Sequence, residues 1–224
     1  WIKILNEQSI IAVDTETSSL NPLDANLVGV SFSYAPNKAC YIPLAHKNIK
    51  GLKKEIVLKK IKPILEDPSI KKVGQNIKFD LLVLSQNNIE INPIEDTMLI
   101  SYTLDAGNNR HNLDTLSEIH LNHKTISYKE LVGTGKNKLN FSDITLDKAT
   151  EYAAEDADVT LRLYNYLRAR LDEEKLNKIY EDFEKPMVKL LSKLEFNGIK
   201  VDDMYLKKLS KNFEEKLKKI EKEI

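Results

Sequence analysis

The sequence has one cysteine, no net charge and no long apolar run, and each shortage excludes a class of protein. With Cys40 as its only cysteine, the chain cannot form an intramolecular disulfide or a zinc site built on cysteines. No stretch is long and apolar enough to span a membrane, and the N-terminus lacks the pattern of a signal peptide. We therefore expect a cytoplasmic protein. Basic and acidic residues both total 34, so net charge gives no indication of nucleic-acid binding.

What the chain does contain is a set of four acids in segments that otherwise look buried. They are Asp14 and Glu16 in IIAVDTETSSL, Asp80 in VGQNIKFDLLVL and Asp156 in EYAAEDADVTLRL. The apolar run at residues 10–13 predicts a strand that is buried on both faces. Side chains alternate across a strand, so Asp14 and Glu16 point the same way. Asp156 lies in a helical row that otherwise looks core-facing, so we expect it to point inward.

Buried carboxylates that converge need a cation between them, because burial and mutual repulsion both disfavour their charged form. Few cationic side chains lie near these segments, so a metal ion is the simplest explanation. Ligands that are all oxygen suit Mg²⁺ or Mn²⁺, which share their coordination shell with substrate phosphates. The pattern therefore indicates phosphate chemistry that depends on a divalent ion.

Each acidic motif also has a simpler interpretation. An Asp-x-Glu pair after an apolar run is often the polar end of a strand. Asp80 can be interpreted as an ordinary acid in the first turn of a helix, where the helix dipole favours a negative charge. Asp156 has two acidic neighbours, Glu155 and Asp158, and can be interpreted as part of a helix face that is exposed to solvent. The order of the motifs along the chain favours the metal site, since three weak signals occur together.

The three segments resemble the three sequence motifs of the DEDD superfamily of 3′–5′ exonucleases. The likeness continues through ANLVGVSFSYAP, YIPLAH, DTMLISYTLDAGNNRHNLDTLSE and HKTISYKELVGTGKNKLNF, and so covers nearly the whole chain. These segments are similar to the proofreading domains of bacterial family A DNA polymerases, the DNA polymerase I family. Tyr152, four residues before the last acid, resembles the tyrosine branch of the superfamily.

The resemblance implies a mechanism with two divalent ions, Mg²⁺ or Mn²⁺, on either side of the last phosphodiester of a DNA strand. The expected catalytic residues are Asp14, Glu16, Asp80, Tyr152 and Asp156, and the four acids among them are the expected metal ligands. By similarity, Asp14 would bridge both ions, Glu16 and Asp156 would complete the site for the attacking water, and Asp80 would support the second ion through water. Tyr152 and Glu16 would orient the water, because a phenol with a pKa near 10 is a poor base at neutral pH.

The resemblance also implies contacts with the substrate, a single-stranded or frayed primer-terminus DNA. The positions that match the family are Thr17, Leu20, Asn76, Arg110 and Tyr128. Leu20 would act as an apolar wedge against the terminal base, and the others would approach the strand. Tyr128 also fits a half-buried aromatic residue under a loop, and Thr17 also fits a cap or a turn.

The spacing of apolar residues predicts an α/β fold with a mixed sheet flanked by helices. Strands are predicted at residues 10–15, 27–34, 39–43 and 71–74, and helices at 52–66, around Asp80, and at 97–104, 113–121 and 146–171. The stretch between the last two helices is expected to form loops. The family resemblance makes this architecture ribonuclease H-like, because spacing alone does not give the order of the strands.

A change of character after about residue 172 predicts two parts, an exonuclease domain at 1–172 and a helical segment at 173–224. A helix at 183–196 is expected to end at Asn197-Gly198. An amphipathic stripe follows, formed by Leu206, Leu209, Phe213, Leu217, Ile220 and Ile224. The resemblance implies the truncated start of a polymerase domain, the base of its thumb, in a fragment whose partner is the rest of the polymerase chain. A separate helical hairpin and a dimerising coiled coil are the alternatives.

Two other functions agree with the same residues. One is a ribonuclease D-like enzyme that trims RNA from its 3′ end with the same four acids. The other is a non-catalytic module that keeps the fold to bind strands or to support a polymerase. All four acids and Tyr152 are present, which makes the second alternative the weaker one.

Overall fold

The computed structural model describes residues 1–47, 52–135 and 138–223, and it divides into two compact units. Trp1–Lys193 forms the first unit and Leu194–Ile224 the second. Within the described ranges, we find no helix with the length and apolar character needed to cross a lipid bilayer.

The first unit is built on a five-stranded mixed sheet, and the sequence predicts the mixed sheet and four of its strands. Its strands are β1 (Ile10–Thr17), β2 (Leu27–Ala35), β3 (Lys38–Pro43), β4 (Lys71–Gly74) and β5 (Ile94–Asp96). Their order across the sheet is β3-β2-β1-β4-β5. The pairs β1–β2 and β2–β3 are antiparallel, while β1–β4 and β4–β5 are parallel. β1 is therefore the central strand, with a partner on each side.

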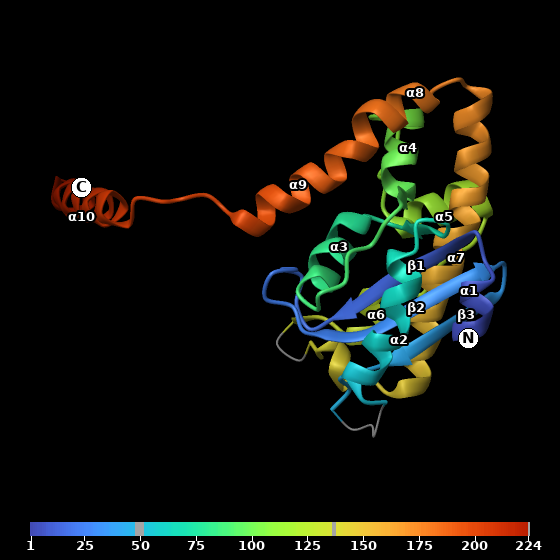
Figure 1. Ribbon diagram of the computed structural model, residues 1–224. Helices are drawn as coiled ribbons and strands as arrows, with labels where there is room; N and C mark the ends of the chain where they lie inside the picture. The colour runs from blue at the N-terminus through green and yellow to red at the C-terminus, as the bar shows by residue number, and fades with distance from the viewer. Residues whose placement is uncertain (48–51, 136–137, 224) are drawn as a thin grey trace. The chain divides into compact units, whose positions relative to one another are not determined.

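Helices cover both faces of this sheet (Figure 1). The first five helices of the described residues are α1 (Ile2–Asn6), α2 (Lys54–Glu66), α3 (Ile77–Ser85), α4 (Thr97–Asp105) and α5 (Leu113–Leu121). They are followed by α6 (Tyr128–Val132), the 3₁₀ turn η2 (Phe141–Asp143) and the long helix α7 (Leu146–Glu173). The sequence predicts α2, α3, α4, α5 and α7 to within a few residues. It does not predict α1, β5, α6 or η2.

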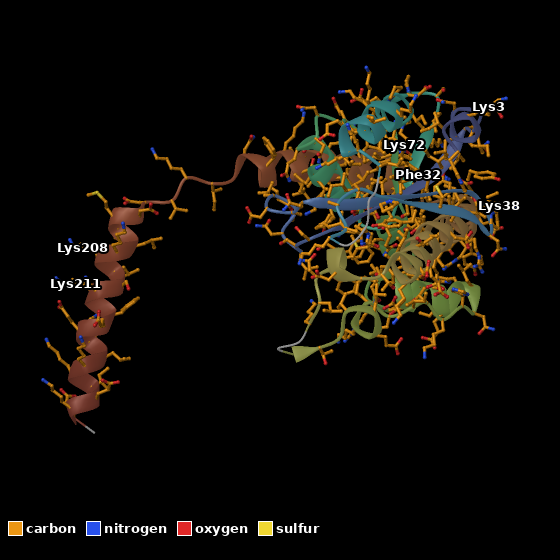
Figure 2. All side chains as sticks on the ribbon, turned by 90° about the horizontal axis from the view of Figure 1, so that it is seen from below. Lys3, Phe32, Lys38, Lys72, Lys208 and Lys211 are labelled. Carbon is orange, nitrogen blue, oxygen red and sulfur yellow. The ribbon has the colours of Figure 1, made fainter. Side chains whose placement is uncertain are left out.

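Alternate residues of β1 contribute to two different apolar cores. Ile11 and Val13 pack with side chains of α2 and α3, whereas Ala12 packs with side chains of α7. Figure 2 shows the sheet from its edge, with α2 and α3 on one side and α7 on the other. Since side chains alternate, Asp14 and Glu16 continue the face of Ala12, which is the face that α7 covers.

After α7 the first unit continues as far as Lys193, which lies within the last helix of the following segment. This segment forms α8 (Asn177–Ile179), the π-helical turn η3 (Tyr180–Glu184) and α9 (Lys185–Asn197). Tyr180 is completely buried, donates its hydroxyl proton to Glu95 at 3.0 Å and accepts the backbone N–H of Asp96 at 3.0 Å. The Nζ atom of Lys185 lies 2.9 Å from Oε1 of the same glutamate. Residues beyond 172 therefore complete the core around β5.

The predicted end of the helix before Gly198 is confirmed. α9 ends at Asn197, and Gly198 has a φ of +66°, the left-handed region that favours glycine after a helix. The second unit contains α10 (Asp203–Glu223). This helix carries the predicted amphipathic stripe, except for Ile224, which lies outside the described residues.

Candidate metal centre

Three of the predicted acids meet on one face of β1. Asp14 and Glu16 follow the buried part of this strand, and Asp156 comes from α7, which packs against the same face. One carboxylate oxygen of each residue lies within 4.8 Å of the other two. The sequence thus predicts correctly which way these three side chains point.

Asp80 approaches the same strand from α3, on the opposite face. It is buried, and its Oδ1 accepts two hydrogen bonds from Thr15, one from the backbone N–H at 2.9 Å and one from the hydroxyl at 2.5 Å. Thr15 lies between Asp14 and Glu16 in the chain. Asp80 is therefore fixed beside the three converging acids without being one of that group.

Burial disfavours the charged form of all four acids, and for three of them the charge of a neighbouring acid adds to this effect. Burial raises the pKa of Asp14 to about 6. Burial also raises the pKa of Glu16 well above its usual value, and the charges of Asp14 and Asp156 raise it further. The pKa values of Asp80 and Asp156 are raised by burial and then by the charge of Asp14. The folded chain thus opposes full ionisation of these acids unless a cation offsets their charge.

The donor set fits a small divalent cation. Its ligands are all carboxylate oxygens, which are the ligands that Mg²⁺ and Mn²⁺ prefer. Donors around Mg²⁺ lie about 2.1 Å from the ion, so opposite donors are separated by about 4.2 Å. The spacing of no more than 4.8 Å between the oxygens of the three acids is close to that distance.

Tyr152 lies one helical turn before Asp156 on α7. Burial raises the pKa of the Tyr152 phenol far above its usual value, and the neighbouring charges, with Asp156 first, raise it further. The phenol therefore stays neutral and can donate a proton in a hydrogen bond. Its ring lies 6.0 Å from that of Tyr128 and 6.0 Å from that of Phe141, measured between centroids.

The three acids and Tyr152 line a hollow of about 520 Å³. Three predicted substrate residues, Thr17, Leu20 and Tyr128, also line it. Leu20 is 82% exposed, so a large apolar side chain faces solvent beside the acids. An exposed leucine beside a tyrosine ring offers the kind of surface on which an unpaired base can stack.

The structure does not bring the other two predicted substrate residues to this hollow. Among the residues that the structure describes, Asn76 and Arg110 are exposed but not part of the lining. Asn76 is the N-cap residue that precedes α3; it has a left-handed φ of +58°, and its backbone N–H donates to Asp96 at 3.1 Å. Arg110 lies between α4 and α5.

Sequence reasoning did not identify several residues that line the hollow. Phe79, Lys138, Leu139 and Asn140 are the larger ones. The Lys138 ammonium lies 5.4 Å from the centroid of the Tyr128 ring, and the Asn140 amide donates to the carbonyl of Ser18 at 2.8 Å. Phe79 is the only one with a local signal, because it directly precedes a predicted ligand, Asp80.

A central strand that ends in acids, faced by an acid from the long helix α7, is the arrangement of a ribonuclease H-like exonuclease. The structure of NrnC from Brucella melitensis has a similar fold, with a TM-score of 0.68 and 25% sequence identity over 89% of this chain and 90% of that one. The predicted fold class is confirmed.

The chain belongs to the 3′–5′ exonuclease family of family A DNA polymerases, because residues 1–172 match the model of that family. It is 41% identical to DNA polymerase I of Rhizobium leguminosarum and 40% identical to that of Pseudomonas aeruginosa, each over all of this chain. The chain spans about a quarter of the length of these relatives, 24% and 25%. The resemblance seen in the sequence is confirmed, and the ribonuclease D-like alternative is not favoured. The family is metal-dependent, in agreement with the acidic cluster.

Proposed function

We propose that this chain is the proofreading part of a longer bacterial DNA polymerase I. It removes the last nucleotide from a single-stranded or frayed 3′ end of DNA by hydrolysis that depends on two divalent ions. The observation that carries the proposal is the group of three carboxylates, from Asp14, Glu16 and Asp156, at the wall of an open hollow. The relation to polymerases that are about four times longer supports the rest of the polymerase chain as its partner, and a cytoplasmic location.

The basis for the proposed metal site is that its possible ligands are all carboxylate oxygens. Asp14, Glu16 and Asp156 would hold the ions directly, and Asp80 would support one of them from the other face of β1. When bound, Mg²⁺ or Mn²⁺ lowers the pKa of water enough to supply a nucleophile near neutral pH and neutralises charge on the phosphate. The structure of Brucella melitensis NrnC with bound Mg²⁺, a protein 25% identical to this chain, supports this proposal.

The chain's own side chains orient the reacting groups. The Glu16 carboxylate accepts a hydrogen bond from the attacking water, and the neutral phenol of Tyr152 holds the water by a second hydrogen bond. Attack on phosphorus breaks the bond to the 3′ oxygen of the preceding nucleotide, which takes up a proton. The products are a nucleoside 5′-monophosphate and a strand shortened by one nucleotide. Positioning of this kind contributes through orientation rather than through proton transfer.

The residues that line the hollow are the basis for the proposed contacts with the substrate. Leu20 separates the terminal base from its neighbour, and Tyr128 provides a ring on which a base stacks. Neither contact reads the identity of a base. Selectivity for errors then comes from fraying, because a mismatch lowers the free energy needed to unpair the end of the strand. Thr17, Asn76 and Arg110 remain predicted contacts to the strand.

The organisation of the chain into domains is part of the same proposal. Residues 1–172 are proposed as the exonuclease domain and 173–224 as the start of the polymerase domain, at the base of its thumb. The family match to residues 1–172 supports the first boundary.

The experiment is a degradation assay with a 5′-labelled single strand of DNA and an RNA strand of the same length. We expect stepwise shortening of the DNA with Mg²⁺ or Mn²⁺, none with EDTA, and a loss of more than about 100-fold in Asp14→Ala. Glu151→Ala is the matched control, since Glu151 is an exposed acid of the same helix that carries Tyr152. Equal rates in wild type and Asp14→Ala, or a strong preference for RNA, would refute the proposal.

A further inference from the structure

A buried tyrosine–histidine pair lies outside the hollow, behind its acids. The Tyr41 hydroxyl lies 2.7 Å from Nε2 of His46, and Nδ1 of His46 lies 3.2 Å from the carbonyl oxygen of Ile144. A carbonyl oxygen only accepts, so His46 carries its proton on Nδ1 and its Nε2 accepts the proton of the Tyr41 hydroxyl. Both side chains are only 8% exposed, and burial lowers the pKa of His46.

One side of this pair lies next to Glu16. Gly29 lies opposite Glu16 in the antiparallel pairing of β1 with β2. A Cβ atom added to Gly29 would lie 2.1 Å from the hydroxyl oxygen of Tyr41, so the phenol occupies the space that a side chain would need there. Burial raises the pKa of Tyr41, and the charges of Glu16 and Asp14 raise it further. The phenol thus forms the neutral surface beside these acids.

On its other side, the pair contacts the ring of Phe141, which in turn contacts the ring of Tyr152. The centroid of Phe141 lies 6.3 Å from that of Tyr41, 5.9 Å from that of His46 and 6.0 Å from that of Tyr152. Phe141 is 1% exposed, so it has no freedom to turn toward solvent. Edge-to-face and tilted ring contacts at these distances fix the relative orientation of the rings.

We propose that Tyr41 and His46 are positioning residues, which hold Glu16 and Tyr152 in the orientation that hydrolysis requires. The proposal rests on the function proposed above for the acids of β1. The hydrogen bond of the pair fixes the Tyr41 ring over Gly29, beside Glu16. It also fixes the His46 ring against Phe141, which in turn contacts Tyr152. Neither residue lines the hollow among the described residues, so they act through others and not on the substrate.

Two substitutions of His46 separate its hydrogen bonds. In His46→Gln the amide reaches the place of Nε2 and keeps an acceptor for the Tyr41 hydroxyl. In His46→Asn the shorter amide reaches only the place of Nδ1, so that acceptor is lost. Tyr41→Phe removes the donor and keeps the ring. A positioning role predicts a fall in kcat of about 10-fold in Tyr41→Phe and His46→Asn, with KM within about 2-fold, and recovery of kcat in His46→Gln.

The Tyr152→Phe background shows whether the pair acts through Tyr152. If it does, Tyr41→Phe lowers kcat much less in this background than in wild type, because coupled residues are not additive. A purely structural role predicts equal losses in both backgrounds. Unchanged kcat in Tyr41→Phe and His46→Asn, a rise in KM alone, or an equal loss in both backgrounds would overturn the proposal. If Tyr41→Phe does not fold, the comparison of His46→Asn with His46→Gln gives the answer.

A measurement without metal or substrate separates this inference from the proposed function. In protein labelled with fluorotyrosine, the ¹⁹F resonance of Tyr152 is assigned by its loss in Tyr152→Phe. We expect this resonance to shift in His46→Asn and to return to its wild-type position in His46→Gln. A resonance that stays in place in both variants contradicts the inference, even if the wild-type chain degrades DNA. If the wild-type chain releases no nucleotide, the proposed function fails, and the spectra still test the contact with Tyr152.

Discussion

Removing the charge of Asp14 should stabilise the metal-free protein at pH 8 and abolish its activity. Burial raises the pKa of this carboxyl from 3.8 to about 6, so the folded state keeps a proton that the unfolded state releases. For an acid with a raised pKa, the destabilising effect is absent below about pH 4, grows as the pH rises toward 6, and is complete above that. A shift of about two pH units corresponds to about 3 kcal/mol at pH 8. Asp14→Asn keeps the shape of the side chain and removes this cost.

The assay is urea unfolding in EDTA at pH 4.5 and pH 8, followed by far-UV circular dichroism. We expect the free energy of unfolding of Asp14→Asn to exceed that of wild type by about 3 kcal/mol at pH 8 and by about 1 kcal/mol at pH 4.5. Glu151→Gln, at an exposed position of α7 beyond its first turn, is the control and should change little at either pH. Addition of Mg²⁺ at pH 8 should stabilise wild type but not Asp14→Asn, because binding to the folded state adds to stability.

Two results would refute this reasoning. If Asp14→Asn lowers the stability of the metal-free protein at pH 8, the carboxylate makes favourable contacts that outweigh its burial. If its effect is the same at pH 4.5 and pH 8, ionisation of Asp14 is not the source of the difference. Either result would remove the electrostatic argument for a cation at this site.

Three further substitutions test separate parts of the structure. Tyr152→Phe should lower kcat about 10-fold or more with little change in KM in steady-state assays, because the hydroxyl orients the water; a change in KM alone would contradict this role. Leu20→Ala should raise KM for single-stranded DNA several-fold and leave the melting temperature unchanged; equal KM values would exclude the wedge. Tyr180→Phe should lower the free energy of unfolding by about 1–3 kcal/mol, since Glu95 loses a buried donor; Tyr205→Phe, at an exposed position, is the control, and equal losses would contradict this reasoning.

The parts of the fold that the sequence predicts are those with a local apolar pattern. The strand at Ile10–Thr17 and the long helix at Leu146–Glu173 both follow from such patterns. β5 has only three residues, Ile94–Asp96, and two of them are acids, which is unusual for a buried strand. Its burial depends on Tyr180 and Lys185, which lie about 90 residues further along the chain and could not be paired with it by spacing.

In the candidate site, too, the sequence predicts only the residues that a local pattern places. The direction of Asp14, Glu16 and Asp156 follows from the periods of a strand and a helix, so these three could be placed together in advance. The hydrogen bonds between Asp80 and Thr15 depend on how α3 packs across β1, which no local pattern gives. The same holds for Lys138, which reaches the hollow from a segment that the sequence leaves as a loop.

Two buried glutamates of the first unit show why burial of an acid does not by itself indicate a metal. Glu95 is 1% exposed, yet it accepts a hydrogen bond from the Tyr180 hydroxyl and pairs with the Lys185 ammonium at 2.9 Å, so its charge is balanced within the fold. Glu16 is 7% exposed, and the effects on its pKa come from burial and from the charges of other acids, all of which raise it. Evolution of a stable fold alone gives no reason to keep such a repulsive group, whereas a cation that binds phosphate does. The imbalance of charge around Glu16, rather than its burial, is therefore what supports the metal centre.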